Sequence, residues 1–368
     1  MACQGNTTSS RPSQQLQLLP SRTPVTEQPP NNASDMHEIQ LRHKLAAPTF
    51  KLLCGIPSSP DRREVLHRAC LAAEFRSFPM KQAERGFFRH VNDHSPVPYP
   101  VRETVSEPWH KVFLLVQIDL HGAGWPNKVS ADARKNLHQE RGRIYVLLDH
   151  VLRCLVDILG RGRDGRGVNV ALDVLRSVKA GVWEGSCNEL LQVQGIGLAK
   201  MGRLAQAGIK SVKQLSRLDF FHIERLLSRN PPFGHQLLHQ IAGFPLLTLQ
   251  FDIVGQHLAS STSGPSGSNA AQKESLLIAR IVLGHENEDK PLWRKKHPWT
   301  TLVIEGEGGK LLWFWRGSVK RLAGGKELVV GLDATRGEQL KVTFACEEVV
   351  GTIIRSTHLV SEDSFAMK

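Results

Sequence analysis

The sequence has few cysteines and no closely spaced cysteine pair. Its six cysteines are scattered over 368 residues, and no CxxC pattern occurs. Neither a disulfide framework nor a zinc site has its spacing here, and this usage is typical of a reducing compartment. We therefore expect no metal site in this chain.

Long apolar runs are missing as well. No apolar stretch reaches the about 18 residues that a membrane span needs, and the first residues are polar rather than signal-like. No run of several heptads is present, so the sequence does not fix an oligomeric state. The sequence predicts an intracellular, soluble protein with no membrane partner.

Catalytic and nucleotide-binding motifs are also absent. The pairs Gly309-Lys310 and Gly325-Lys326 are not followed by Ser or Thr, as a phosphate-binding P-loop requires, and neither GxSxG nor HExxH occurs. We therefore expect no catalytic residue and no cofactor of this chain's own.

Positive charge is what the sequence has in excess. Lys and Arg number 47 against 35 Asp and Glu, which gives a net charge of +12. Such a balance favours a polyanionic partner, with nucleic acid as the first choice. Basic surfaces without such a partner are also common, so charge alone raises this expectation only modestly.

The spacing of apolar residues divides the chain. Residues 1–35 are rich in Ser, Thr, Gln, Pro and Asn and are expected to form a disordered tail, as are residues 361–368. Apolar residues recur at helical spacing over 36–186, which predicts a helical bundle, and a second helical part follows at 187–245. From 246 to 360 the spacing becomes two, which is typical of strands.

The longest helical pattern runs from Asn136 to Leu159. Its apolar stripe is buried and its flank carries arginines, including Arg143 and Arg153. A solvated charged face is the ordinary interpretation of such a flank and outweighs a nucleic-acid contact when no other signal is present. We also expect Ser106 to cap a helix that starts near Pro108, and residues 160–167 to form a flexible basic loop.

A glycine turn stands at the centre of the second helical part. Gly195-Ile196-Gly197 separates two short apolar helical segments within residues 190–215, which predicts a helical hairpin. The amides that open the second helix should point outward and attract phosphate, and Lys200, Arg203 and Lys210 surround the turn. The pattern resembles a helix-hairpin-helix, which grips the DNA backbone without reading bases. The alternative is a tight turn that serves only a core.

Seven short strands predict an immunoglobulin-like or fibronectin-like sandwich after Pro245. On the fourth strand, Phe314 should point to one face and Trp313 and Trp315 to the other. We expect the tryptophans to be core residues rather than base-stacking platforms. The expected strands are 248–254, 275–283, 300–305, 311–316, 327–332, 339–346 and 352–354. The predicted fold class is α + β multidomain, an all-helical bundle with a helix-hairpin-helix followed by a β-sandwich.

Five segments stand out beside the order of parts. The segments are Ala72-Ala73-Glu74-Phe75 with Glu84-Arg85, Val105-Ser106-Glu107-Pro108-Trp109-His110-Lys111, Val182-Trp183-Glu184 and Arg229-Asn230-Pro231-Pro232-Phe233-Gly234. The order of parts resembles the C-terminal Sec-sixty-three (Brl-homology) domain of Ski-two-like helicases, and these segments look closest to the meiotic crossover ATP-dependent DNA helicase subgroup. The resemblance covers roughly Met36 to Val360.

This resemblance implies a path for single-stranded DNA. Residues 136–159 would be the ratchet helix of the family, with Arg143, Tyr145 and Arg153 as its strand contacts. The turn and the following helix, with Gly195, Gly197, Lys200 and Arg203, would hold the backbone of the exiting strand. The motor domains of the family are absent from this chain, so ATP and Mg would be needed only if a motor is supplied elsewhere.

The resemblance leads to one principal hypothesis and two alternatives. The first is a nuclear accessory region of a meiotic-type DNA helicase that guides single-stranded or branched DNA during homologous recombination, as a fragment or a motor-less paralogue. The second is a protein-interaction scaffold of the same family, with partners on the β-sandwich. The third is a membrane-associated translocation relative, which the lack of membrane spans and the SEPWHK and RNPPFG segments disfavour.

Overall fold

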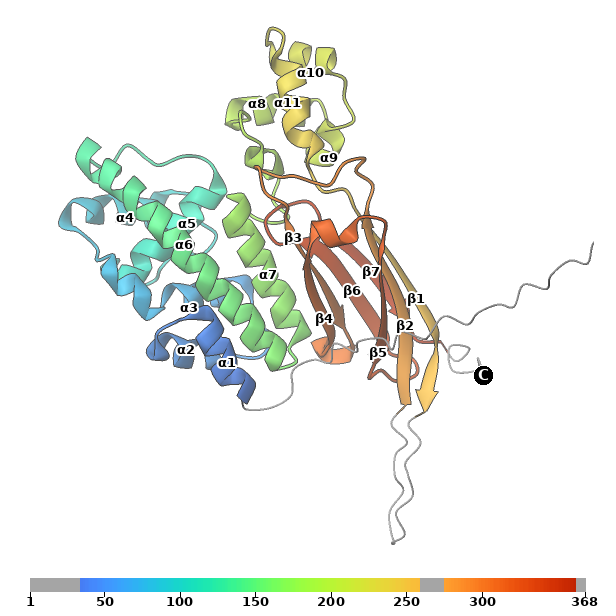
Figure 1. Cartoon of the computed structure of the whole chain (residues 1–368). Coiled ribbons are helices and arrows are strands. Elements are labelled where there is room, and N and C mark those ends of the chain that lie inside the picture. Colours follow the sequence, from blue (N-terminus) through green and yellow to red (C-terminus); the bar gives the residue numbers. More distant parts are fainter. Residues whose placement is uncertain (1–33, 259–274, 362–368) are drawn as a thin grey trace, which may run out of the picture.

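The fold has three layers and a separate lobe (Figure 1). The computed structural model describes residues 34–258 and 275–361. A helical bundle covers one sheet, a second sheet lies behind the first, and a small helical lobe stands at one end. The expected tails fall almost wholly outside the described residues, except that the first helix already begins at Ser34. The protein is thus an α plus β fold.

The bundle is built around one apolar core that all of its helices share. None of the helices in the described ranges combines the length and apolar character needed to cross a membrane. The elements are α1 (Ser34–His43), α2 (Ala47–Cys54), α3 (Arg62–Cys70), the 3-10 helix η1 (Ala73–Ser77), α4 (Gln82–His94), α5 (Pro108–His121), α6 (Ala131–Arg161) and α7 (Gly165–Ala180).

Helix α5 begins at Pro108, as expected, but its N-cap residue is not the expected one. Its N-cap is Glu107 and not Ser106. The reason is the buried His110, whose Nδ1 accepts hydrogen bonds from the amides of Ser106 and Glu107 at 3.1 and 3.0 Å. A side chain of the first turn therefore binds the backbone amides just before the helix, with Glu107 at the N-cap position.

Helix α6 is longer than the apolar stripe that predicted it. It begins at Ala131, where the Ser130 hydroxyl accepts the amide of Ala133 at 3.3 Å. The added residues before Asn136 lack the periodic apolar pattern, but Ser130 gives them a good N-cap. At the other end, α6 continues to Arg161 and α7 begins at Gly165, so the expected flexible loop at 160–167 is only three residues long. Thirty-one residues make α6 about 46 Å long.

The lobe follows α7 and contains four short helices. Its elements are the 3-10 helix η2 (Glu189–Gln192), α8 (Leu198–Gln206), α9 (Val212–Leu215), α10 (Phe220–Leu227) and α11 (Phe233–Ala242). The first arm of the expected hairpin is therefore a single 3-10 turn rather than an α-helix. Ser211 caps α9, because its hydroxyl accepts the amide of Gln214.

The β-part contains two antiparallel sheets, with strand orders β1-β2-β5 and β4-β3-β6-β7. Six strands match the expected positions within a few residues, whereas β7 begins at the predicted last residue, Ile354. Its residues are mostly polar, so its place depends on pairing with β6 rather than on apolar alternation. The strands are β1 (Leu247–Leu258), β2 (Ser275–His285), β3 (Trp299–Glu305), β4 (Leu311–Ser318), β5 (Lys326–Leu332), β6 (Gln339–Cys346) and β7 (Ile354–Leu359), with 3-10 helices η3 (Glu307–Gly309) and η4 (Val319–Leu322).

Strand β4 contributes to both cores of the protein. Phe314 packs against the helical bundle, together with Val303 and Leu311. Trp313 and Trp315 belong to the second core, which fills the space between the sheets and continues into the lobe. The predicted division of these aromatic residues between two faces is confirmed. The lobe and the sheets thus share one continuous core.

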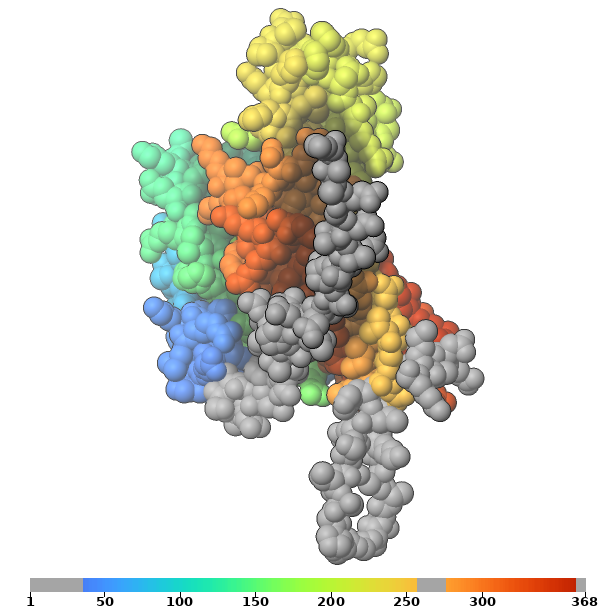
Figure 2. Space-filling model, turned by 45° about the vertical axis from the view of Figure 1, so that its right-hand side comes forward, coloured from blue at the N-terminus to red at the C-terminus, as the bar shows by residue number. Residues whose placement is uncertain are grey.

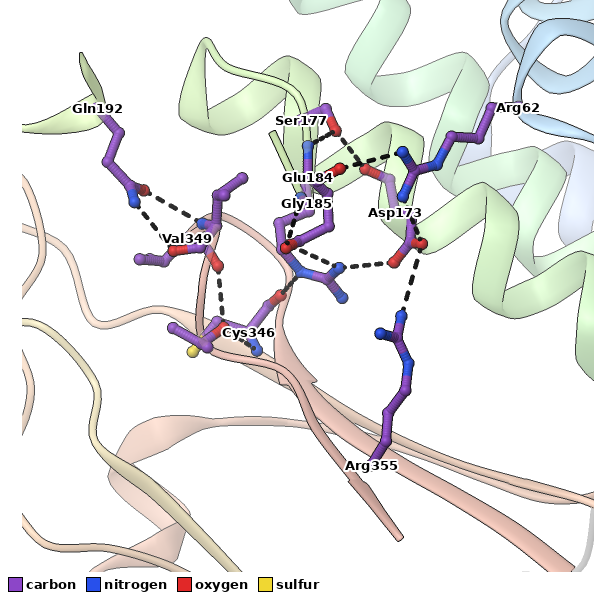
Figure 3. A network of polar contacts seen from close by, with 12 residues as sticks. Arg62, Asp173, Ser177, Glu184, Gly185, Gln192, Cys346, Val349 and Arg355 are labelled. Atoms are coloured by element: carbon purple, nitrogen blue, oxygen red, sulfur yellow. Dashed lines mark hydrogen bonds and ion pairs between the residues drawn. The ribbon is translucent and has the colours of Figure 1, made fainter. Parts of the chain in front are cut away.

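A buried arginine, Arg176, joins the bundle to the sheets, and its partners Asp173, Glu184 and Cys346 are labelled in Figure 3. Arg176 of α7 is 1% exposed. Its Nε donates to the carbonyl of Cys346 at 2.5 Å, and its Nη1 donates to Asp173 at 2.9 Å and to Glu184 at 3.2 Å. Each partner lies on a different segment, so one guanidinium fixes the end of α7, the chain that leads to the lobe and the end of β6.

Hydrogen bonds of Gln192 and Arg294 also hold the lobe to the sheets and to the end of α7. The Gln192 amide donates to the carbonyl of Val350 at 2.9 Å and accepts from its amide at 3.1 Å. Arg294 donates to the carbonyls of Ala180 and Gln192 at 3.1 and 2.8 Å. The 3-10 turn that leads into the glycine turn is therefore anchored to the sheets.

We predict that Arg176→Met lowers the free energy of unfolding by about 3 kcal/mol, because Glu184 and Asp173 lose a buried counter-charge. Urea unfolding followed by circular dichroism measures this. The control is Arg355→Met, whose guanidinium lies 3.8 Å from Asp173 and is 62% exposed, so that the expected cost is below about 1 kcal/mol. Equal effects of the two substitutions would contradict the role given to Arg176.

Candidate nucleic-acid interface

The glycine turn before α8 is open to solvent. Gly195 has φ +87°, a left-handed conformation that favours glycine. Gly197 is the extended N-cap of α8, and a Cβ at either position would meet nothing within 4 Å. Both glycines, with Leu198 and Ala199, are exposed. A ligand can therefore approach the backbone of this turn closely.

Helix α8 is the one α-helix of the lobe in which no side chain accepts a hydrogen bond from a first-turn amide. The other three helices each receive a carboxylate. Glu189 accepts the amide of Val212 in α9, Asp219 that of His222 in α10 and Glu224 that of Gly234 in α11, each at 2.8 Å. The amides of the first turn of α8 have no partner within a helix. They form a positive end that attracts anions.

The charges of the lobe add to this effect. Residues 187–245 contain seven Lys and Arg against three Asp and Glu, and those three carboxylates are the ones that cap α9, α10 and α11. Within the described residues, none of the seven cations forms an ion pair with a carboxylate. Figure 2 shows that the lobe projects from the rest of the molecule. The cations are Lys200, Arg203, Lys210, Lys213, Arg217, Arg225 and Arg229.

Two of these cations lie on α8, and one of them contacts the turn. Lys200 Nζ donates to the carbonyl of Gly195 at 2.6 Å and lies 4.4 Å from the centre of the Phe233 ring. Partial burial and the nearby charge of Arg229 lower the pKa of Lys200. Arg203 donates to the carbonyl of Leu227 at 3.1 Å. A phosphate at the open amides would offer Lys200 a stronger acceptor than this carbonyl.

The structure brings together Gly195, Gly197 and Lys200, whereas Arg203 is bonded to the end of α10 and Lys210 lies beyond the other end of α8. No sequence pattern predicted Phe233 or Arg229 at this site. Both belong to the segment Arg229-Asn230-Pro231-Pro232-Phe233-Gly234, which leads from α10 into the start of α11 and carries part of the family resemblance. Their nearness to Lys200 depends on how α11 packs, which no local pattern reveals.

The three residues proposed on the long helix have different surroundings. Arg143 is exposed, and its guanidinium lies 5.2 Å from the centre of the Phe78 ring. Tyr145 donates its hydroxyl to Asp119 at 3.0 Å, and burial together with the charge of Asp119 raises the pKa of Tyr145 well above its usual value. Asp119 also accepts the Arg141 Nε at 2.5 Å. Tyr145 therefore contributes to packing between α5 and α6.

Arg153 lies against the sheets. It pairs with Asp149 of its own helix and with the buried Glu347 after β6, each at 3.2 Å. Burial opposes its charge, but the carboxylates of Glu347 and Asp149 outweigh this and raise the pKa of Arg153. The outward face of α6 is instead formed by Lys135, Arg143, Val146 and His150, which are all exposed.

No metal site is found in the part of the chain that the structure describes. No group of three or more His, Cys, Asp or Glu side chains there could hold a metal ion. The described cysteines are free, and burial raises the pKa of the Cys70 and Cys346 thiols. These thiols are poor nucleophiles, because the thiolate is the reactive form.

The chain is similar to known proteins over most of its length. The Sec63 Brl domain family matches residues 39–357. The ATP-dependent DNA helicase MER3 of Saccharomyces cerevisiae is 22% identical over 335 residues, which are 88% of this chain and 27% of that protein. The MER3 homolog of Oryza sativa is 23% identical over 86% of this chain and 25% of its own length. The probable ATP-dependent DNA helicase HFM1 of Homo sapiens is 22% identical over 60% of this chain. The chain spans about a quarter or less of the length of these relatives.

We predict that Gly195→Ala lowers the free energy of unfolding by about 1–2 kcal/mol, because alanine is strained at a left-handed φ. Gly197→Ala is the matched control, since its backbone is extended and its surroundings are open. The poorer N-cap and the lower entropy of the unfolded chain should then nearly cancel. Urea unfolding of both variants measures the difference, and a more stable Gly195→Ala would contradict the turn geometry.

Proposed function

Because the chain belongs to the Sec63 Brl domain family, we propose that it is a DNA-binding accessory region of a meiotic-type ATP-dependent DNA helicase. Its substrate is single-stranded or branched DNA, and it acts either as part of a longer helicase or as a motor-less paralogue. The observation that supports this most directly is the uncapped N-terminus of α8 among cations that form no ion pair. The names of the similar proteins, all DNA helicases, point to the same substrate.

The lobe acts as a helix-hairpin-helix with a shortened first arm. Its open amides after Gly197 bind a phosphate of the DNA backbone, while Lys200 and Arg203 neutralise the charge. These backbone amides and cations contact phosphates rather than base edges, so binding does not depend on the DNA sequence. Lys210, at the far end of α8, contacts a neighbouring phosphate.

Helix α6 supplies a second contact along the strand. Arg143 reaches the phosphates from the outward face of the helix, because its guanidinium forms no ion pair among the described residues. Tyr145 and Arg153 act as positioning residues that hold α6 to α5 and to the sheets. The helix is thereby kept rigid beside the strand that it guides.

The two sheets form an immunoglobulin-like or fibronectin-like sandwich that braces this assembly. Strand order and the shared core between the sheets support this description. A second candidate function is protein binding through the outer face of the three-stranded sheet. Leu276 and Val329 are 39% and 60% exposed there, on neighbouring strands. Exposed apolar side chains on adjacent strands are typical of a protein contact when they form a patch.

ATP hydrolysis and its Mg²⁺ belong to motor domains outside this chain. They are supplied by the same polypeptide or by a separate helicase, since the chain matches only a part of its relatives. The proposed place of action is the nucleus, during homologous recombination in meiosis.

We predict that Lys200→Glu with Arg203→Glu weakens binding to a labelled single-stranded oligonucleotide at least about tenfold. The negative slope of log association constant against log salt should become shallower by about 1.4. Fluorescence anisotropy across a salt series measures both quantities. The charge-matched control is Lys320→Glu with Arg321→Glu, two exposed residues of η4 in the sandwich. Unchanged binding by the first double variant would reject the lobe as the DNA site.

We further predict that Arg143→Glu weakens binding a few-fold and makes the same negative salt slope shallower by about 0.7, which corresponds to one lost phosphate contact. The control is Arg280→Glu, which lies on the outer face of the three-stranded sheet and pairs with Glu327. The same anisotropy titration serves both. If Arg143→Glu and Arg280→Glu bind alike, α6 does not contact the strand.

A further inference from the structure

Three aromatic rings form a short column on the lobe. The His235 ring of α11 stacks on Phe220 of α10 with 3.7 Å between ring centres and 27° between planes. The Phe221 ring follows at 3.9 Å from Phe220, tilted by 37°. Phe221 is 66% exposed. The column therefore ends in solvent at a ring that is supported from behind.

An exposed phenylalanine alone would carry little meaning, because single apolar residues are common on protein surfaces. Here the ring is fixed by the two rings behind it, so another flat ring can extend the column with little loss of side-chain freedom. Stacking of this kind is favourable between aromatic rings and is available to every nucleobase.

The column lies next to the proposed phosphate site. A Cβ on Gly234 would stand 2.3 Å from the carbonyl oxygen of Phe220, so α10 and α11 cross in direct backbone contact there. Phe233, the neighbour of Gly234, has its ring 4.4 Å from Lys200 Nζ. Contacts thus run without a gap from the turn before α8, through the start of α11, to the aromatic column.

The charges around the column suit a nucleic acid. Arg225 follows Phe221 by one helical turn and is exposed, with its guanidinium 3.3 Å from the His222 ring. The two carboxylates on this helix and its cap are engaged, since Asp219 accepts the amide of His222 and the buried Glu224 accepts that of Gly234. A phosphate that flanks a stacked base would meet the cation of Arg225, while Glu224 is buried and Asp219 is bonded to the first turn of α10.

We propose that Phe221 is a stacking platform for an unpaired nucleobase, next to the phosphate grip of α8. This inference rests on the proposed function and adds a selection rule to it. A base inside a duplex is covered on both faces by its neighbours and cannot extend the column, whereas a base in a single strand or at a branch can. The lobe therefore prefers unpaired DNA, although the phosphate contacts alone cannot distinguish the two forms.

The test compares two oligonucleotides of the same length with the full chain, by fluorescence anisotropy. One carries bases, and the other is abasic at its central positions, so that it keeps the phosphates and lacks the rings. Loss of one base–aromatic stack corresponds to about a 5- to 150-fold loss of affinity. We expect the native chain to bind the strand with bases tighter by a factor in this range.

The variant Phe221→Ala should remove this difference and leave binding to the abasic strand unchanged, while Phe221→Trp should restore it. Because the ring is exposed, the unfolding midpoint should stay the same, and Leu359→Ala on β7, a residue that is likewise 66% exposed, serves as the apolar control on the sandwich. If the native chain binds both strands equally well, or Phe221→Ala keeps the difference, the stacking platform is refuted and the phosphate grip stands. Failure to bind either strand at low salt would refute the proposed function itself.

Discussion

The buried guanidinium of Arg176 is the constraint on which the arrangement of the three parts depends. The residue is 1% exposed, so its charge is balanced by the carboxylates of Asp173 and Glu184, while its Nε donates to a carbonyl of the sheet. These partners come from the bundle, from the chain that leads to the lobe and from the end of β6. A shift of either carboxylate would weaken the balance of this buried charge. The direction in which the lobe projects is therefore set at a point remote from the glycine turn.

Carboxylates are used differently in the two helical regions. In the bundle they pair with cations across helices, as Glu84 and Glu140 do with the buried Lys111 at 2.7 and 2.5 Å. In the lobe the three carboxylates cap helix ends, and the cations remain available to an external anion. The net positive charge of the chain thus has its greatest effect where the backbone amides of α8 are also open. Charge and open amides at one place favour phosphate more than either does alone.

Phosphate binding and base stacking would divide the recognition of DNA between two elements of the lobe. The start of α8 offers amides and charge, which hold any nucleic-acid backbone. The column on α10 and α11 offers a flat apolar surface, which only an unpaired base can use. The outward face of α6 would bind the same DNA strand where it continues over the bundle. A region of a helicase that guides a strand without reading its sequence needs these properties.

The sequence by itself determined the elements and the chemistry of single residues. Glycine at 195 and 197 predicted an open turn, alternation predicted most strands, and Trp313, Phe314 and Trp315 were correctly divided between two faces, because these signals act over a few neighbouring residues. Tertiary structure decided where those residues point. Sequence spacing placed Arg153 on a basic helix flank, and the family resemblance implied Tyr145 as a strand contact. Asp119 and Glu347, which engage these two side chains, come from distant segments. It likewise decided that His235 and Phe220 stack behind Phe221, because the contact depends on the close crossing of two helices at Gly234.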